Sequence, residues 1–234
     1  MRPLVRQALA EFLGSAGLVT VVIGSGIAAQ RLSPHDVGLQ LLENALATGA
    51  GLAALILAFG PVSGGHFNPV ITLADRFFRG VTSRQVAIYL PAQVVGGIVG
   101  AVIANVMFDL SAVSISGTDR SGAGRWLSEA VATFGLVVLI FALVRAGRVA
   151  LAPFAVGAYI TAAYWWSSST SFANPMIDLA RTLSDTFAGI APSSVPMFVL
   201  MQLVGGAAGV AAVAALYPDV AAVADDVVVP REAA

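Results

Sequence analysis

Two stretches, His66-Phe-Asn-Pro-Val-Ile-Thr-Leu-Ala and Ser171-Phe-Ala-Asn-Pro-Met-Ile-Asp-Leu-Ala, decide the fold of this 234-residue chain. In each, an Asn-Pro pair opens a short apolar helical segment, because Asn is a favoured N-cap and Pro is tolerated at the first helical position. A helix of about ten residues rises about 15 Å, which is half the hydrocarbon thickness of a bilayer. The sequence therefore predicts two half-helices, beginning at Pro69 and Pro175, that enter a membrane without crossing it.

The composition around these stretches is that of a membrane protein. Hydrophobic residues make up 58% of the chain and charged residues 11%, with a mean hydropathy of +0.87, whereas a soluble domain carries about 25% charged residues. Six apolar runs are long enough to span a bilayer: about 8–29, 39–59, 85–107, 126–144, 149–167 and 195–217. We predict an all-α membrane protein with six transmembrane helices and two re-entrant half-helices.

Several functional classes find no support in the sequence. There is no cysteine, and the net charge of −1 gives no signal for nucleic-acid binding. No nucleophile and base set, phosphate loop or metal-ligand cluster is recognisable. We therefore expect neither an enzyme nor a cofactor or metal.

The distribution of arginines predicts the orientation in the membrane. The N-terminus, the segment 76–84 and the loop 145–148 together hold seven of the twelve basic residues, all of them arginines, and lie on one side of the six spans. The positive-inside rule places that side, with both termini, in the cytoplasm. We expect the tail, residues 218–234, to be disordered and cytoplasmic.

The two halves of the chain repeat one another. Glu11 and Glu129 each precede a Gly-rich apolar span, and the two Asn-Pro stretches follow in the same order. The last span of each half carries Gln-x-x-Gly-Gly, beginning at Gln93 and Gln202. Because each half has three spans, the second must insert upside down, which makes an inverted repeat of about 8–108 and 126–217 within one domain, 1–217.

The Asn-Pro pairs predict a polar path at the membrane midplane. The capping oxygen of Asn68 or Asn174 is engaged by its own helix, which leaves the NH₂ group free to donate to a solute oxygen. Non-helical loops at membrane depth must line a polar cavity. Two helix N-termini at one point oppose cations and protons but not neutral hydroxylated molecules.

On these motifs the chain resembles the aquaporin and glycerol-facilitator family, the major intrinsic proteins. The residues that carry the resemblance are Ser63-Gly-Gly-His-Phe-Asn-Pro-Val, Ser171-Phe-Ala-Asn-Pro-Met, Glu11 and Glu129. The resemblance implies a homotetramer in the lipid bilayer, here a bacterial inner membrane, with a pore in each subunit for passive conduction of small neutral solutes. It also implies that Glu11 and Glu129 brace the half-helix loops rather than transfer protons.

The chain departs from the family pattern at the half-helices. The usual Ala after Asn-Pro is Val70 in one half and Met176 in the other, which we expect to alter the packing of the half-helices. The arginine usual three residues after the second Asn is Ile177. Carrying the family's filter across by spacing places its four members at Thr48, Ala162, Ser171 and Ile177. We therefore expect a wide, arginine-free constriction.

The run around Asp178 also resembles bacterial channels associated with arsenic resistance. That resemblance implies arsenite, as neutral As(OH)₃, and glycerol-like polyols as solutes. The alternatives are an ordinary water or glycerol facilitator and a coupled secondary transporter, which inverted repeats also suit.

The roles of the remaining pore-loop residues stay open at this stage. Gly64 and Gly65 shape the first loop, and His66 either lines the lumen, senses pH or braces the loop. Arg181 either replaces the missing filter arginine or forms an ion pair with Asp178 or Asp185. We predict the ion pair with one of these aspartates.

Overall fold

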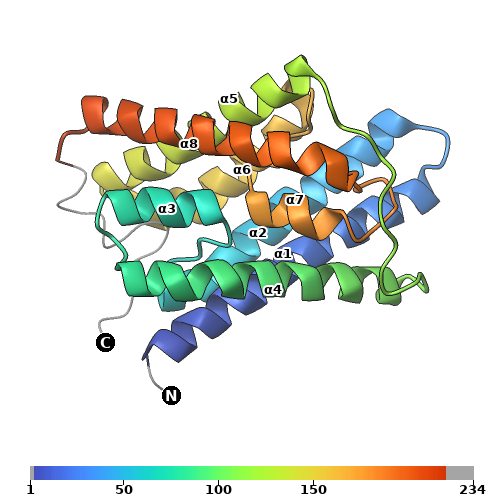
Figure 1. Cartoon of the computed structure of the whole chain (residues 1–234), viewed down its shortest axis with the longest axis horizontal. Helices are drawn as coiled ribbons and strands as arrows, with labels where there is room; N and C mark the ends of the chain where they lie inside the picture. The colour runs from blue at the N-terminus through green and yellow to red at the C-terminus, as the bar shows by residue number, and fades with distance from the viewer. Residues whose placement is uncertain (1–2, 220–234) are drawn as a thin grey trace.

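The computed structural model describes residues 3–219, and every regular element in that part of the chain is helical. In chain order the elements are α1 (Pro3–Leu32), α2 (Val37–Ser63), α3 (Pro69–Phe77), α4 (Ser83–Met107), α5 (Ala123–Arg145), the 3-10 helix η1 (Val149–Leu151), α6 (Ala152–Trp166), α7 (Pro175–Arg181), the 3-10 helix η2 (Pro192–Ser194) and α8 (Val195–Leu216). Six helical segments are long and apolar enough to cross a membrane. The prediction of six spans and two half-helices is confirmed (Figure 1). Of the predicted tail, residues 220–234 lie outside the described residues.

Glycines let the long helices pack backbone to backbone in pairs, α1 with α4 and α5 with α8. A Cβ added at Gly96 or Gly100 of α4 would collide with carbonyl oxygens of α1, and one added at Gly205 of α8 would collide with the carbonyl of Ala130 in α5. Small residues allow this close approach of membrane helices. The Gly-Gly runs that match between the two halves of the sequence therefore hold equivalent helix pairs.

The two half-helices lie between α4 and α8, with α3 and α7 end to end across the middle of the molecule (Figure 1). Asn68 and Asn174 are in extended conformation and cap α3 and α7 by accepting from the backbone N–H of Val70 and Met176. Both caps agree with the preference for Asn at the N-cap, from which they were predicted.

Val70 and Met176 each pack against a glycine of the other half of the chain. A Cβ added at Gly206 of α8 would collide with Cγ1 of Val70, and one added at Gly97 of α4 would collide with Sδ of Met176. The larger residues after Asn-Pro are thus accommodated by small residues on the last long helix of the opposite half.

We expect Gly206→Ala to destabilise the protein by roughly 1–3 kcal/mol, because rigid Val70 cannot move away from the added methyl group. Gly97→Ala should cost less, since the thioether of Met176 is flexible. The double variant Gly206→Ala with Val70→Ala should recover most of the loss. Thermal unfolding in detergent measures all three, and equal melting temperatures for Gly206→Ala and the unchanged protein would contradict this packing.

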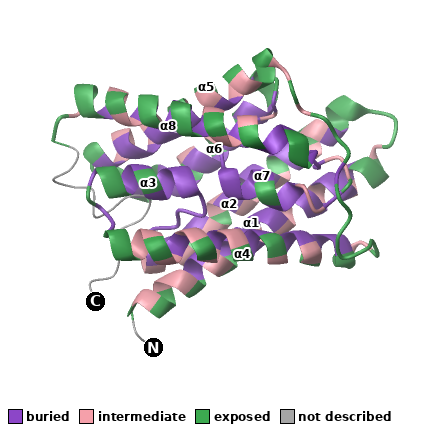
Figure 2. Cartoon of the chain, in the orientation of Figure 1, coloured by how far each residue is buried: buried purple, intermediate pink, exposed green. Residues whose placement is uncertain are grey.

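Burial separates a polar interior from an apolar exterior. Glu11, Glu129, Gln93 and Gln202 are fully buried, whereas large apolar side chains such as Leu203 are exposed on the outside of the helix bundle. Figure 2 shows much of α3 and α7 buried, while α4 and α8 keep exposed outer surfaces. The apolar exterior suits contact with lipid, and the buried carboxylates and amides lie where the two loops before the half-helices meet.

Candidate functional site

The loop before α3 is held in a strained conformation by one carboxylate. Phe67 has φ of 46°, in the left-handed region that costs a non-glycine residue about 1–3 kcal/mol. Glu11 Oε1 accepts from Ser63 Oγ (2.6 Å) and from the backbone N–H of His66 (3.1 Å). Its Oε2 accepts from the N–H of Phe67 and from Gln93 Nε2, both at 2.8 Å. Four hydrogen bonds to one buried carboxylate thus fix the loop.

The loop before α7 repeats this arrangement. Ala173 also has φ of 46°, and the N–H groups of Phe172 and Ala173 donate to the two oxygens of Glu129 at 2.9 and 2.8 Å. Gln202 Nε2 donates to Glu129 Oε2 at 2.6 Å and to Asp178 Oδ1 at 3.2 Å. Both glutamates therefore make the bracing contacts that the family resemblance implied for them.

The two capping asparagines tie the loops to each other at the centre of the molecule. Asn68 Nδ2 donates to the carbonyl of Ala173, and Asn174 Nδ2 donates to the carbonyl of Phe67, each at 2.8 Å. One hydrogen of each NH₂ group is therefore engaged, which corrects the expectation that the whole group is free. Since an amide carries two such hydrogens and both asparagines line a cavity, one donor on each is left for that cavity.

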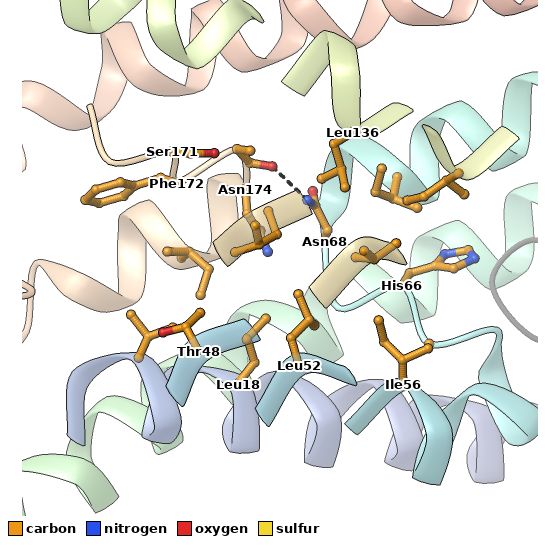
Figure 3. A pocket seen from close by; sticks show the side chains of 18 of the residues that line it. Leu18, Thr48, Leu52, Ile56, His66, Asn68, Leu136, Ser171, Phe172 and Asn174 are labelled. Atoms are coloured by element: carbon orange, nitrogen blue, oxygen red, sulfur yellow. Dashed lines mark hydrogen bonds between the residues drawn. The ribbon is translucent and has the colours of Figure 1, made fainter. Parts of the chain in front are cut away.

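This cavity extends past the asparagine pair, from His66 to Phe172 (Figure 3). Four long helices face it with aliphatic residues spaced four apart, which places them on one side of each helix. These residues are Leu18 and Val22 of α1, Leu52 and Ile56 of α2, Leu136 and Ile140 of α5, and Val156 and Ile160 of α6. Much of the cavity lining is therefore aliphatic.

The two pore loops contribute polar groups to the same lining. These include Asn68, Asn174 and Ser171, and the hydroxyl of Ser171 is buried without a partner among the described residues. Gly65, with φ of 66°, also lines the cavity, whereas Gly64 ends α2 as its left-handed C-cap. A molecule in the cavity therefore meets both hydrogen-bonding groups and aliphatic carbon.

Three of the four filter residues predicted by spacing line this cavity, and one does not. Thr48, Ser171 and Ile177 are lining residues, but Ala162 is exposed on the outside of α6. Ala162 lies two residues, about 200°, from both Ile160 and Tyr164, so it faces away from the lumen. The assignment of Ala162 was wrong because the residue of α6 that lines the cavity lies ten positions before Asn174 and not twelve, and a shift of two residues turns a side chain to the opposite side of a helix.

Tyr164 takes the place that was assigned to Ala162. Its hydroxyl lies 3.2 Å from Thr48 Oγ1, so the two side chains meet across the cavity. The spacing argument missed it, although a tyrosine within an apolar span signals a hydroxyl that needs a buried partner. Phe172 is a second aromatic lining residue, so the cavity lining contains aromatic side chains, whereas the four residues chosen by spacing include none.

Arg181 also lines the cavity, so the lining contains an arginine although none of the four predicted filter residues is one. Its guanidinium lies 3.6 Å from the centroid of the Phe172 ring, and its Nε donates to the carbonyl of Ala188. The predicted ion pair with Asp178 or Asp185 is absent from the described residues: Asp178 accepts from Gln202 and Asp185 from the N–H of Gly117. Arg181 is four residues beyond Ile177, one turn further along α7, on the same face.

His66 lies at the opposite end of the cavity from Phe172 (Figure 3). Its Nδ1 is 3.0 Å from Thr72 Oγ1, and its Nε2 is 3.2 Å from a carboxylate oxygen of Asp75. The side chains of His66 and Asp75 are both fully buried. His66 thus lines the lumen and is also held by side chains of α3. Of the roles left open for it, this position is compatible with both lining the lumen and bracing the loop.

The profile described as "MIP: Major intrinsic protein" matches residues 2–187 of this sequence. The chain belongs to the major intrinsic protein family. Members of this family are membrane channels rather than enzymes, and the chain is an integral membrane protein. The family resemblance carried by the paired Asn-Pro motifs is confirmed.

Similar proteins include channels from distant organisms. Aquaglyceroporin AqpS of Rhizobium meliloti (strain 1021) is 47% identical over 208 residues, covering 89% of this chain and 88% of that protein. The lens fiber major intrinsic protein of Gallus gallus is 40% identical over 113 residues, covering 48% of this chain and 40% of that protein. The X-ray structure of the aquaglyceroporin from Plasmodium falciparum is similar with a TM-score of 0.70 and 18% identity, covering 93% of this chain and 98% of that one. This last likeness shows the fold.

Proposed function

We propose that this chain is a passive channel for water and small neutral hydroxylated solutes, with glycerol-sized polyols and arsenite among them. The observation that carries the proposal is the mixed polar and aliphatic lining of the cavity. The hydroxyls of a polyol reach Asn68, Asn174 and Ser171, while its carbon skeleton contacts the aliphatic side chains. The name of the aquaglyceroporin relative from Rhizobium meliloti supports this solute class.

Arsenite is the finer part of the proposal. As As(OH)₃ it is neutral and displays three hydroxyls, so it can use the same donors as a polyol. Ile177 stands where the family usually has arginine, and it adds aliphatic carbon where a guanidinium would occupy the lumen. The resemblance of the segment around Asp178 to arsenic-associated channels supports the same solute.

A channel is favoured over a coupled transporter by the way the buried carboxylates are used. Glu11 and Glu129 accept hydrogen bonds from loop amides, and no acidic side chain of residues 3–219 lines the cavity. Coupling to protons or cations needs carboxylates that load and unload beside the solute. The lining offers a route for diffusion rather than such a site.

The assembly we propose is a homotetramer in a bacterial inner membrane, with a pore in each subunit and both termini in the cytoplasm. The family resemblance supports the tetramer, and the arginine distribution supports the orientation.

Stopped-flow permeability in proteoliposomes tests the proposed function. Flux of glycerol and arsenite should be linear in the solute gradient and unaffected when a proton gradient is collapsed. Ile177→Arg should lower glycerol and arsenite permeability by about tenfold more than water permeability, because it adds a second guanidinium one turn from Arg181. Ile177→Met, which keeps a similar volume without charge, should leave the ratios near those of the unchanged protein.

Two results would overturn the proposal. Uptake against a gradient driven by pH would make the protein a coupled transporter. Water permeability without passage of glycerol or arsenite would make it an ordinary water channel.

A further inference from the structure

A second cavity adjoins the first at the end near Phe172. Its polar lining comes from Asn44, Arg120, Tyr164, Thr170 and Arg181, and we call it the arginine vestibule. Tyr164 and Arg181 line both cavities. The arginine vestibule therefore lies next to the route of any solute that passes Tyr164.

One aromatic ring and one chain segment position both guanidiniums of the vestibule. The Cζ atoms of Arg181 and Arg120 lie 3.6 and 5.1 Å from the centroid of the Phe172 ring. Arg181 Nε donates to the carbonyl of Ala188, and Arg120 Nε donates to that of Gly189 at 2.8 Å. Both side chains are thus anchored through Nε, which leaves the terminal nitrogens of Arg181 and Nη1 of Arg120 without a hydrogen-bond acceptor among residues 3–219.

The neighbouring carboxylates make no direct contact with these two arginines. Asp119 accepts from Ser121 and Ser194, and Asp178 accepts from Gln202. Within the described chain neither Arg120 nor Arg181 forms an ion pair. Arg181 is only 3% exposed, and a buried charge is normally paired or bound to a ligand.

The charge of each guanidinium is unfavourable for the other. Burial, followed by the positive charges of Arg181 and Arg125, lowers the pKa of Arg120 to about 9. Arg120 therefore remains charged at neutral pH, where an anion between the two groups would relieve both the desolvation and the repulsion.

We propose that the arginine vestibule binds a small oxyanion, such as a carboxylate or phosphate, between Arg120 and Arg181. Guanidinium forks match the two oxygens of such groups, and charge-assisted hydrogen bonds of this kind are stronger than neutral ones. The hydroxyls of Thr170 and Tyr164 add further donors to the same cavity. An anion in this position lies beside the solute route, so its binding obstructs conduction.

The test uses formate and inorganic phosphate as probes, with chloride as the reference anion. Calorimetric titration of the solubilised full chain should show binding of the oxyanions in roughly the millimolar range, as expected for ligands of a few atoms. The same anions should reversibly lower glycerol flux in vesicles of zwitterionic lipid. Binding is measured without flux, so failure of the anion site and failure of the channel proposal are distinguishable.

Three matched variants test which arginines bind the oxyanion. Arg120→Gln and Arg181→Gln should each weaken binding by about tenfold or more, the value of one charge-assisted hydrogen bond. Arg125→Gln removes the same charge from an exposed residue that does not line the vestibule, and it should change binding by less than about threefold.

The proposal would be overturned by absence of oxyanion binding, by chloride binding equal to that of formate, or by binding found only with anionic phospholipid. Equal weakening in Arg125→Gln would also overturn it, since the effect would then be one of net charge alone.

Discussion

Replacing Glu129 with alanine is expected to prevent the protein from reaching a stable folded state in the membrane. The variant leaves the buried N–H groups of Phe172 and Ala173 and the amide of Gln202 without their acceptor. Each orphaned donor costs about 1–3 kcal/mol, and the total stability of a domain is only about 5–15 kcal/mol. The loop also loses the contacts that hold Ala173 at positive φ.

The yield of monodisperse protein and its melting temperature in detergent measure this effect. Glu11→Ala should behave similarly, because Glu11 accepts four hydrogen bonds, from two loop N–H groups, Gln93 and Ser63. Glu43→Ala is the matched control, since Glu43 is also in a membrane-spanning helix but, among the described residues, accepts a hydrogen bond from Ser33 alone. A melting temperature for Glu129→Ala equal to that of Glu43→Ala would show that the carboxylate does not brace the loop.

The second large effect is expected at the crossed asparagines. Asn174→Asp should keep the cap of α7, because a carboxylate still accepts from Met176, but it cannot donate to the carbonyl of Phe67 or to a solute. We expect glycerol permeability to fall by about tenfold or more, as one strong donor is lost and a charge is added. Asn68→Asp should do the same from the other half-helix. Stopped-flow permeability, normalised to the amount of folded protein in the vesicles, is the measurement.

Asn105→Ala is the control that distinguishes an effect on conduction from an effect on folding. Asn105 is a buried asparagine that donates to the carbonyls of Ala112 and Leu183, and it does not line the cavity. It should lower the melting temperature and leave the permeability of each folded channel unchanged. Normal flux through folded Asn68→Asp and Asn174→Asp would remove the asparagine pair from the mechanism.

Several parts of the site could be predicted because they follow from local rules. Asn is a favoured N-cap and Pro is favoured at the first helical position, so an Asn-Pro pair before an apolar run predicts the starts of α3 and α7 from sequence alone. The order of Glu, Asn-Pro and Gln-x-x-Gly-Gly in both halves predicts equivalent positions, and the structure shows equivalent contacts of Glu11 and Glu129.

The lining of the lumen was predicted less well because it depends on how each helix is rotated. Ala162 and Tyr164 are two residues apart, and only the rotation of α6 decides which of them faces the cavity. A spacing count carried through loops of unequal length cannot supply that rotation.

The sequence by itself determined the six spans, the two half-helices, the inverted repeat and the asparagine pair, since these follow from apolar length, capping chemistry and internal similarity. The tertiary structure alone decided the environment of the arginines. Arg120 and Arg181 are 61 positions apart in the printed sequence, yet one aromatic ring and two adjacent carbonyls bring their guanidiniums to the same cavity. The physical reason is that a charged side chain takes its partners from the surfaces folded around it, and here the carboxylates that are neighbours in sequence are turned toward other donors.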